Sequence, residues 1–461
     1  MLSPEEVRLL EFFEAGFDRG LRLYQFIRYA VGVFRIGQTL QKLVDGRRAP
    51  AIRTFDVTLA LLMAAVLRVP SLNELERLLK DGRFQKLLGH RGSKLRGKGL
   101  FSADTIVDVL DTLETATLQA ALVEIIKKAE RNKAFRDDTF GTFITVAIDG
   151  WEPFCTYKRH CPGCLSRKVT VKSKDDDGNE IKEKVTQYYH RFVVAFLIAP
   201  KLDLTLAIEP VLSSDLREDL PVKEARHEGE LTAALRLIDR LHKDYGCFID
   251  AFALDGLYPS GPVFEKLKKY NYGAFIIAKD KNKDPYRFAE SIWEHRDTPD
   301  EVTTDPQTGE KVEFWSLKDV DALKTFDGSV NMLKANVTRK NGKVSTWVIA
   351  LVGKAKRTSR LLALRIMRAR WHIENTAFHQ WTTKWNLDHC YRHTPNAITS
   401  VMHIWALAFN LMQVFFYRRL GKPRRGRKVT DTIVICVKQM WIDIGALTKP
   451  VPWYLLLKDS T

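Results

Sequence analysis

Apolar residues recur at helical spacing through the first part of the chain. They lie three and four positions apart between residues 9 and 17 and again between residues 59 and 66, which places them on one face of an amphipathic helix. Ser71 followed by Glu74 forms a capping box, which marks the start of another helix. We therefore expect an all-α region at residues 1–138.

The hydrophobic period changes near Thr139, where β-branched and aromatic residues begin to form short runs. The runs predict three strands, a helix, a strand, a helix and a strand. This α/β order is typical of a mixed sheet flanked by helices, because three meandering strands are followed by two helical crossovers. The expected strands cover residues 142–149, 188–199, 202–212, 248–255 and 272–279, and the expected helices cover residues 228–245 and 262–270.

A polar, interrupted stretch at residues 281–356 predicts a β-rich insertion after this first part of the sheet domain, which covers residues 139–280. Two Gly-containing segments in the insertion, after Asp305 and after Arg339, are typical of hairpin turns. Residues 357–417 then return to helical spacing and are expected to complete the sheet domain. The expected strands of the insertion are 312–317, 331–339 and 344–352, and the expected later helices are 359–385 and 396–417.

The charge of the chain is strongly basic. Lys and Arg number 73 against 56 Asp and Glu, a net charge of +17, and such a field attracts polyanions, of which nucleic acid is the commonest. A basic tail is expected at residues 418–461, because residues 418–428 hold seven basic side chains and no acidic one. We expect the helical region 1–138 to serve DNA binding or dimerisation.

No targeting or membrane segment is expected. The start of the chain lacks the basic region and cleavage site of a signal peptide. The longest apolar run, residues 404–416, is interrupted by Asn410 and Gln413. Six cysteines in a chain of this length do not suggest a disulfide scaffold. The expected location is the cytoplasm, in association with the nucleoid.

Acidic residues end two of the expected strands, Asp149 the first and Asp255 the fourth. Adjacent strand ends can bring two carboxylates into one pocket, where they repel each other unless a cation lies between them. Oxygen ligands of this kind suit Mg²⁺ or Mn²⁺, and two such ions about 4 Å apart support phosphoryl transfer. Each acid is followed by glycine, so a simple turn after a strand is the alternative for either one alone.

A third acid, Glu374, lies four residues after Arg370, so the two side chains share a helix face. The arginine is always charged and is suited to contact phosphate or to orient the glutamate. An ordinary surface ion pair is the alternative, and such pairs contribute little stability.

Three segments carry a resemblance to a known family: the strand ending at Asp149, residues 254–280 and residues 370–384. They resemble the DDE transposases of bacterial insertion sequences, most closely the group with a β-rich insertion before the catalytic glutamate. The resemblance spans about residues 140–415. It implies a ribonuclease H-like core, with Asp149, Asp255 and Glu374 as catalytic residues and ligands of two Mg²⁺ or Mn²⁺ ions.

In related groups a Tyr, an Arg and a Lys accompany the glutamate. Arg370 fits the Arg, but Met367 stands at the Tyr position and Trp381 at the Lys position, with Lys384 one helical turn further on. Some relatives also stack a tryptophan on a flipped base, a role open to Trp315 or Trp347 besides core packing. The expected auxiliary and DNA-binding residues are Arg370, Lys384, Arg418, Arg419, Arg424 and Arg425.

A cysteine–histidine pattern follows the first strand. Cys161-Pro-Gly-Cys164 is typical of a zinc knuckle, and Cys155 and His190 would complete a tetrahedral site for structural Zn²⁺. Reduced thiols in a loop are the alternative. The segment between them, 169–185, is expected to be a charged loop. Residues 388–393 form a second cluster that we expect to begin a helix or to line the DNA path.

The expected function is that of a cut-and-paste DNA transposase. It would act as an endonuclease at the terminal inverted repeats and then transfer the freed 3′ hydroxyl into target DNA. A homodimer is expected, because two transposon ends must be joined together. The alternatives are a ribonuclease H-like nuclease without strand transfer and a catalytically inactive DNA-binding descendant.

Overall fold

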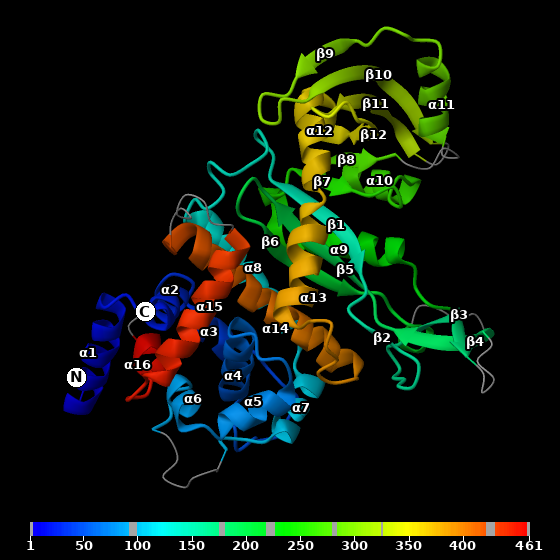
Figure 1. Ribbon diagram of the computed structural model, residues 1–461. Helices are drawn as coiled ribbons and strands as arrows, with labels where there is room; N and C mark the ends of the chain where they lie inside the picture. Colours follow the sequence, from blue (N-terminus) through cyan, green and yellow to red (C-terminus); the bar gives the residue numbers. More distant parts are fainter. Residues whose placement is uncertain are drawn as a thin grey trace.

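The N-terminal part of the chain is a bundle of helices (Figure 1). The computed structural model describes residues 3–91, 99–174, 180–217, 226–278, 284–323, 326–420 and 429–458. Of the capping box expected at Ser71, the structure has the first half: the Ser71 side chain accepts a hydrogen bond from the Glu74 amide, whereas the Glu74 side chain pairs with Arg77. The helices of this region are α1 (Pro4–Asp18), α2 (Arg22–Gly32), α3 (Ile36–Gln41), α4 (Thr54–Val66), α5 (Leu72–Leu79), α6 (Gly82–Leu87), α7 (Ala103–Thr112) and α8 (Thr115–Arg131).

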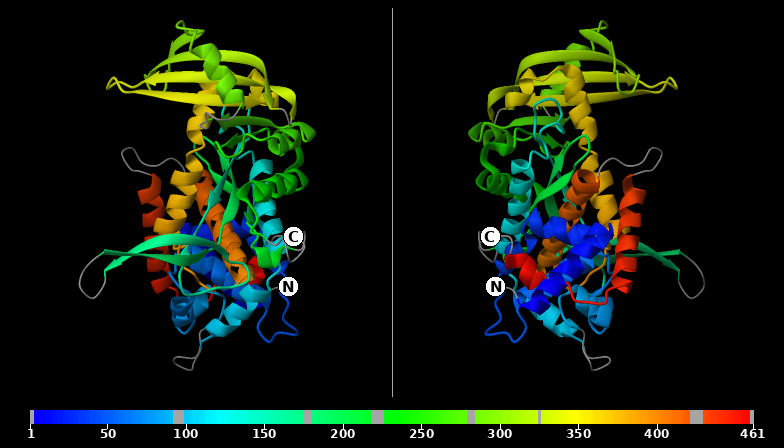
Figure 2. Two further views of the ribbon diagram at one scale, coloured as in Figure 1. Left: turned by 90° about the vertical axis from the view of Figure 1, so that its right-hand side faces the viewer. Right: turned by 90° about the vertical axis from the view of Figure 1, so that its left-hand side faces the viewer.

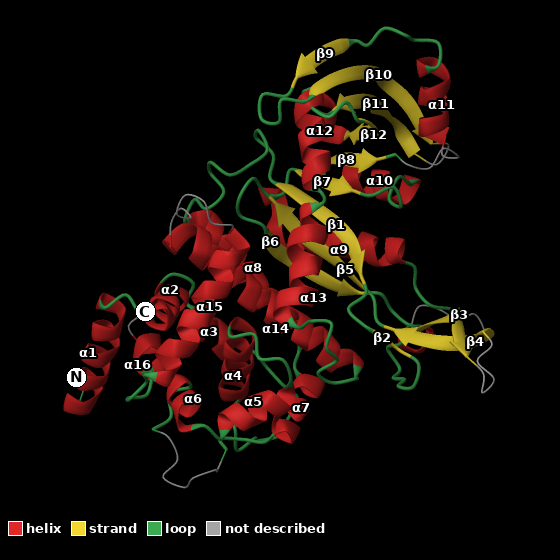
Figure 3. Cartoon of the chain, in the orientation of Figure 1, coloured by secondary structure: helices red, strands yellow, loops and turns green. Residues whose placement is uncertain are grey.

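The core is the expected mixed sheet flanked by helices (Figure 3). Its strand order is β6-β5-β1-β7-β8. The first three strands pair antiparallel, and β1, β7 and β8 pair parallel through helical crossovers. The fold class predicted from the sequence is therefore confirmed. The elements are β1 (Thr145–Trp151), β5 (Phe192–Ile198), β6 (Leu204–Pro210), α9 (Glu230–Tyr245), β7 (Ala251–Leu254), α10 (Gly261–Lys269) and β8 (Gly273–Ile277).

The β-rich insertion continues this same sheet. Its strand β12 pairs antiparallel with β8, and β11, β10 and β9 follow in turn to give nine strands. The insertion lies at the upper end of the molecule in Figure 1. Backbone groups at the edge of β8 are thus hydrogen-bonded to β12 instead of being left open. The elements are α11 (Asp284–Trp293), β9 (Glu301–Thr304), β10 (Lys311–Leu323), β11 (Phe326–Thr338) and β12 (Val344–Val352).

The single strand expected at residues 188–199 is wrong. The chain leaves one sheet at Tyr189 and enters the other at Phe192. The predicted charged loop is also wrong, because β3 (Leu165–Lys174) and β4 (Glu180–Tyr189) form a hairpin there. Together with β2 (Cys155–Thr156) it makes a three-stranded sheet, here called the arm, which projects from the body (Figure 2). Apolar and charged residues tend to alternate along β3 and β4, as expected for strands. The high charge of the segment had suggested a loop instead.

The longest helix, α14 (Pro395–Val414), runs through the centre of the molecule against α4, α7, α8 and β6. By length and composition, residues 395–420 could cross a membrane, contrary to the sequence expectation. Burial decides its role, since 94% of the apolar window lies inside the protein. Asn410 makes two hydrogen bonds, of 2.8 and 2.7 Å, with the backbone of Thr205 on β6. This is the behaviour of a core helix.

The C-terminal helices return to the N-terminal bundle. The helix α15 (Val429–Gly445) packs on α2 and α6, and α16 (Trp453–Lys458) packs on α2 and α3. The Trp453 indole donates a 2.7 Å hydrogen bond to the Leu87 carbonyl. We therefore propose that residues 429–458 form one helical body with residues 1–138. Arg424 and Arg425 lie outside the described residues.

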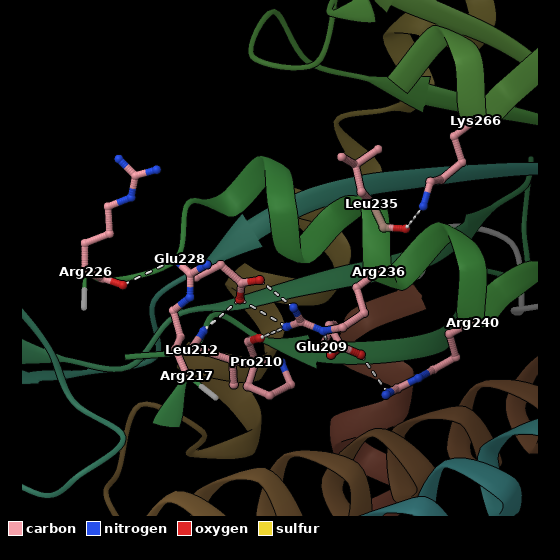
Figure 4. Close-up of polar contacts among 10 residues, drawn as sticks. All are labelled: Glu209, Pro210, Leu212, Arg217, Arg226, Glu228, Leu235, Arg236, Arg240 and Lys266. Atoms are coloured by element: carbon pink, nitrogen blue, oxygen red, sulfur yellow. Dashed lines mark hydrogen bonds and ion pairs between the residues drawn. The ribbon is translucent and has the colours of Figure 1, made fainter. Parts of the chain in front are cut away.

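An ion network around two buried glutamates fixes α9 to the end of β6 (Figure 4). Arg236 donates to Glu209 at 2.5 Å and to the Pro210 carbonyl at 2.8 Å, and it also pairs with Glu228. Arg240 forms a second ion pair with Glu209 at 2.8 Å. Both glutamates are almost fully buried, so their charges need these partners. The network holds the first turn of α9 beside the carboxyl end of β1.

Candidate active site

Three acidic side chains far apart in the sequence meet around one arginine. Nη1 of Arg370 lies 2.9 Å from Oδ2 of Asp149, and its Nη2 lies 2.9 Å from Oε1 of Glu374 and 4.0 Å from Oδ1 of Asp255. Asp149 is on β1 and Asp255 follows β7, a parallel neighbour in which Ile148 pairs with Leu254. The parallel register therefore brings the two aspartates to the same edge of the sheet.

The helical segment that carries Glu374 crosses the sheet beside this edge. It consists of α12 (Arg360–Ala369), η5 (Ile373–Phe378) and α13 (His379–Trp385). The middle piece, η5, is a π-helical turn, which inserts an extra residue and changes the direction of the side chains that follow. Arg370 and Glu374 remain in contact across the start of this turn. The third acid of the site, Glu374, therefore lies in an irregular part of a helix.

The arginine lies beneath the acids. Its side chain is 3% exposed, whereas the side chains of Asp149, Asp255 and Glu374 are 19%, 33% and 37% exposed. Of the two roles expected for Arg370, phosphate contact and orientation of the glutamate, this geometry fits the second. The carboxylates keep part of their surface open to solvent, where a cation or substrate can approach.

A fourth acid, Glu230, adjoins the site. It accepts a 3.0 Å hydrogen bond from Tyr258 and pairs with Arg191. A Cβ atom at Gly150 would lie only 2.2 Å from Oε2 of Glu230, so the glycine after Asp149 allows this close approach. Sequence reasoning missed Glu230, because a lone glutamate in the first turn of a helix is ordinary.

Burial raises the pKa of Asp149 to about 6, although the nearby Arg370 charge and the Gly150 amide lower it; Glu374 and Glu230 add repulsion. One arginine thus compensates the acids only in part. A group of carboxylate oxygens with this residual negative charge fits a hard divalent cation such as Mg²⁺ or Mn²⁺.

The raised pKa predicts a pH dependence in metal-free protein. The folded-state pKa of about 6 exceeds the ordinary aspartate pKa of 3.8. The contribution of Asp149 to stability is therefore present at low pH and is lost as pH rises through 6. Asp149→Asn cannot ionise and should become more stable than wild type by up to roughly 3 kcal/mol above that pH. Denaturant unfolding of both proteins in EDTA from pH 4 to pH 8 measures the difference, and an unchanged difference would contradict the expectation.

A second cluster lies at the base of the arm. The Cys161 and Cys164 sulfurs are 3.7 Å apart, and Nε2 of His190 is 3.3 and 3.5 Å from them. Nε2 of His393 lies 3.4 Å from the Cys164 sulfur. The four ligand atoms all lie within 4.8 Å of one another.

The expected ligand set needs one correction. Cys155 is exposed, and its sulfur accepts a 3.2 Å hydrogen bond from Gln187 instead of joining the cluster. Its place is taken by His393, which precedes α14. The sequence showed the cluster at residues 388–393 but gave no reason to place it beside Cys164, because only the path of the chain brings the two together.

The remaining predicted residues lie in varied surroundings. Lys384 is exposed on α13, whereas Met367 and Trp381, which stand at the family positions for Tyr and Lys, are fully buried. Arg418 donates to the Asn132 carbonyl at 3.2 Å, and Arg419 lies over the Phe17 ring. The two tryptophans of the insertion, Trp315 and Trp347, are buried and partly buried against the hydrophobic core.

Comparison with known proteins finds a match to one family model and similarity to solved structures. Residues 219–411 match the model of the transposase DDE domain, a range that includes Asp255, Arg370 and Glu374 but not Asp149. Among solved structures, the chain is similar to a piggyBac transposase synaptic complex with hairpin DNA, at 13% identity and a TM-score of 0.41. The alignment covers 95% of this chain and 84% of that one. No curated protein sequence is significantly similar.

Proposed function

We propose that this chain, which carries a transposase DDE domain, cleaves DNA at transposon ends and transfers the freed 3′ hydroxyl into target DNA. The observation that carries the proposal is the meeting of Asp149, Asp255 and Glu374 around Arg370. Two of the acids lie at adjacent strand ends and the third lies on the helix that crosses them, and all three side chains are partly exposed. The reaction class is metal-dependent phosphoryl transfer by a cut-and-paste route.

The donor set fits two Mg²⁺ or Mn²⁺ ions, which would activate the attacking oxygen and stabilise the leaving one. Asp149, Asp255 and Glu374 would hold them. Arg370 orients Asp149 and Glu374 through its two 2.9 Å contacts and limits their mutual repulsion. Glu230 contacts Tyr258 and Arg191, and these contacts hold its carboxylate beside Asp149.

Double-stranded DNA is the proposed partner, in the form of transposon ends and target. The net charge of +17 supports this, because phosphate neutralisation supplies most nonspecific DNA affinity. Lys384, Arg418 and Arg419 are exposed and available for such contacts. We also propose a homodimer, since cut-and-paste transfer joins two ends in one reaction, and a nucleoid location in the cytoplasm.

A strand-transfer assay tests the function. A labelled duplex ending in the terminal inverted repeat that flanks the gene is supplied already cleaved, together with a supercoiled plasmid and Mg²⁺. Covalent joining of the label to the plasmid is expected, and EDTA should abolish it. Nicking without joining would favour a ribonuclease H-like nuclease, and neither activity would favour a catalytically inactive DNA-binding descendant.

A further inference from the structure

We propose that Cys161, Cys164, His190 and His393 together bind one structural zinc ion. The assignment is independent of the catalytic acids and does not rest on the proposed reaction. Two thiolates and two imidazoles form one of the usual ligand sets of structural zinc. Both cysteines are free thiols, and one ligand atom of each of the four side chains lies within 4.8 Å of the other three.

The distances between ligand atoms match a tetrahedral site. With Zn–S bonds of about 2.3 Å and Zn–N bonds of about 2.0–2.1 Å, tetrahedral angles place two sulfurs ~3.8 Å apart and a sulfur and a nitrogen ~3.6 Å apart. The observed Cys161–Cys164 separation is 3.7 Å. Three of the four sulfur–nitrogen separations are 3.3, 3.5 and 3.4 Å, and the fourth is within 4.8 Å. Four donors at these spacings surround a point that one zinc ion can occupy.

The surroundings are those of a closed structural site. Cys161, Cys164 and His190 are buried, and His393 is half-buried. The Phe154 ring packs against both imidazoles, with centroids 6.0 and 6.2 Å away. Structural zinc sites have four protein ligands and no open position, whereas catalytic ones keep a place for water. The four side chains and the covering ring therefore favour a structural role.

The Pro-Gly pair between the cysteines allows this loop to pack closely against His190 and Pro395. A Cβ atom at Gly163 would lie 2.8 Å from Cγ of Pro395 and 3.2 Å from Cε1 of His190. The amide of Cys164 donates a 2.9 Å hydrogen bond to the Cys161 carbonyl, which closes the turn. Glycine is therefore needed here for space, because a side chain would collide with Pro395 and His190.

The ion would join three parts of the molecule. The cysteines precede the first long strand of the arm, and His190 stands between the arm and the core strand β5. His393 belongs to a segment anchored on the helical region. There Arg392 forms a 3.1 Å ion pair with Asp111, and Asn396 donates to the Leu110 carbonyl at 3.0 Å. A single metal thus fixes the arm relative to both the sheet and the N-terminal helices.

The cluster also adjoins the catalytic edge. His190 is followed by Arg191, which pairs with Glu230, and Glu230 lies beside Asp149. Zinc bound at His190 would therefore restrain the backbone from which Arg191 reaches Glu230. The zinc would affect the active site only by holding Arg191 in place and would take no part in the reaction. Zinc occupancy can therefore be measured without any DNA substrate.

Metal analysis of the purified full-length protein tests the assignment. We expect elemental mass spectrometry to find one zinc ion per chain. Cys161→Ser and His393→Ala should each weaken zinc binding more than about 100-fold, since even outer-shell substitutions cost about 10- to 100-fold. The matched control is Cys155→Ser, which removes a nearby thiol outside the cluster and should keep full occupancy.

Cobalt substitution of the wild-type protein keeps the test valid if a variant fails to fold. Co²⁺ at this site should give a thiolate-to-metal charge-transfer band and the d–d spectrum of a tetrahedral ion. Chelation should make the arm and residues 386–394 more sensitive to protease. Absence of zinc from protein purified from zinc-supplemented cells, together with no cobalt–thiolate band, would overturn the proposal. Full zinc in His393→Ala combined with loss in Cys155→Ser would overturn the ligand set.

Discussion

Replacing Asp255 with asparagine is expected to lower the rate of strand cleavage and joining by at least about 1,000-fold while leaving DNA-end binding near wild type. The amide removes a charged oxygen ligand from a site that must hold divalent cations. Loss of one neutral donor in a preorganised site already costs about 100- to 1,000-fold. Because the Asp255 side chain is 33% exposed, the fold should tolerate the change.

The measurement pairs a cleavage assay with a gel-shift assay on the same labelled end. Asp327→Asn is the matched control, because it removes an acid whose side chain is fully exposed on β11. That variant should cleave at the wild-type rate. Wild-type cleavage by Asp255→Asn would remove this residue from the catalytic set.

Replacing Arg370 with methionine is expected to lower the free energy of unfolding of the metal-free protein by about 3–5 kcal/mol, the usual cost of removing one partner from a buried ion pair. Three carboxylates would lose the cation that lies between them, and Asp149 is the most buried of the three. Arg370→Lys should recover only part of the loss, because an ammonium group cannot make the two parallel contacts of a guanidinium.

Magnesium should distinguish this role from ordinary packing. A divalent cation that binds only the folded state stabilises it in proportion to its affinity. The uncompensated acids of Arg370→Met should therefore gain more stability from Mg²⁺ than those of wild type. Denaturant unfolding with Mg²⁺ and with EDTA measures both effects.

The control for this experiment is Arg365→Met, on the same helix. Arg365 pairs with the buried Asp305 of the β-rich insertion, so its loss should destabilise the protein without changing the Mg²⁺ response. Equal Mg²⁺ responses in the two variants would contradict a special role for Arg370.

Much of the fold follows from local patterns. The core strands other than the one expected at residues 188–199 were predicted to within a few residues, as were the crossover helices and the helix beginning after Ser359. Hydrophobic spacing is a local property, and the strand and helix periods differ enough to be separated along the chain. The three acids were found through strand ends and through the family resemblance of the segments around them.

Other features escaped the sequence for identifiable reasons. The break at His190 lies inside a run of aromatic and β-branched residues that continues in both directions. The hairpin at residues 165–189 was hidden by its charges, because both of its faces are largely solvent-exposed. The helix expected at residues 396–417 is present as α14, but the sequence did not show which partners its buried polar side chains have, such as the Thr205 backbone on β6 for Asn410.

By itself, the sequence determined the order of strands and helices, the basic charge, and the presence of acids at two strand ends. The tertiary structure alone decided which distant side chains meet: Arg370 under three carboxylates, Glu230 beside Asp149, and His393 in place of Cys155. The physical reason is that periodicity reports which face of an element is buried. It does not report which other element covers that face, and this depends on the path of the whole chain.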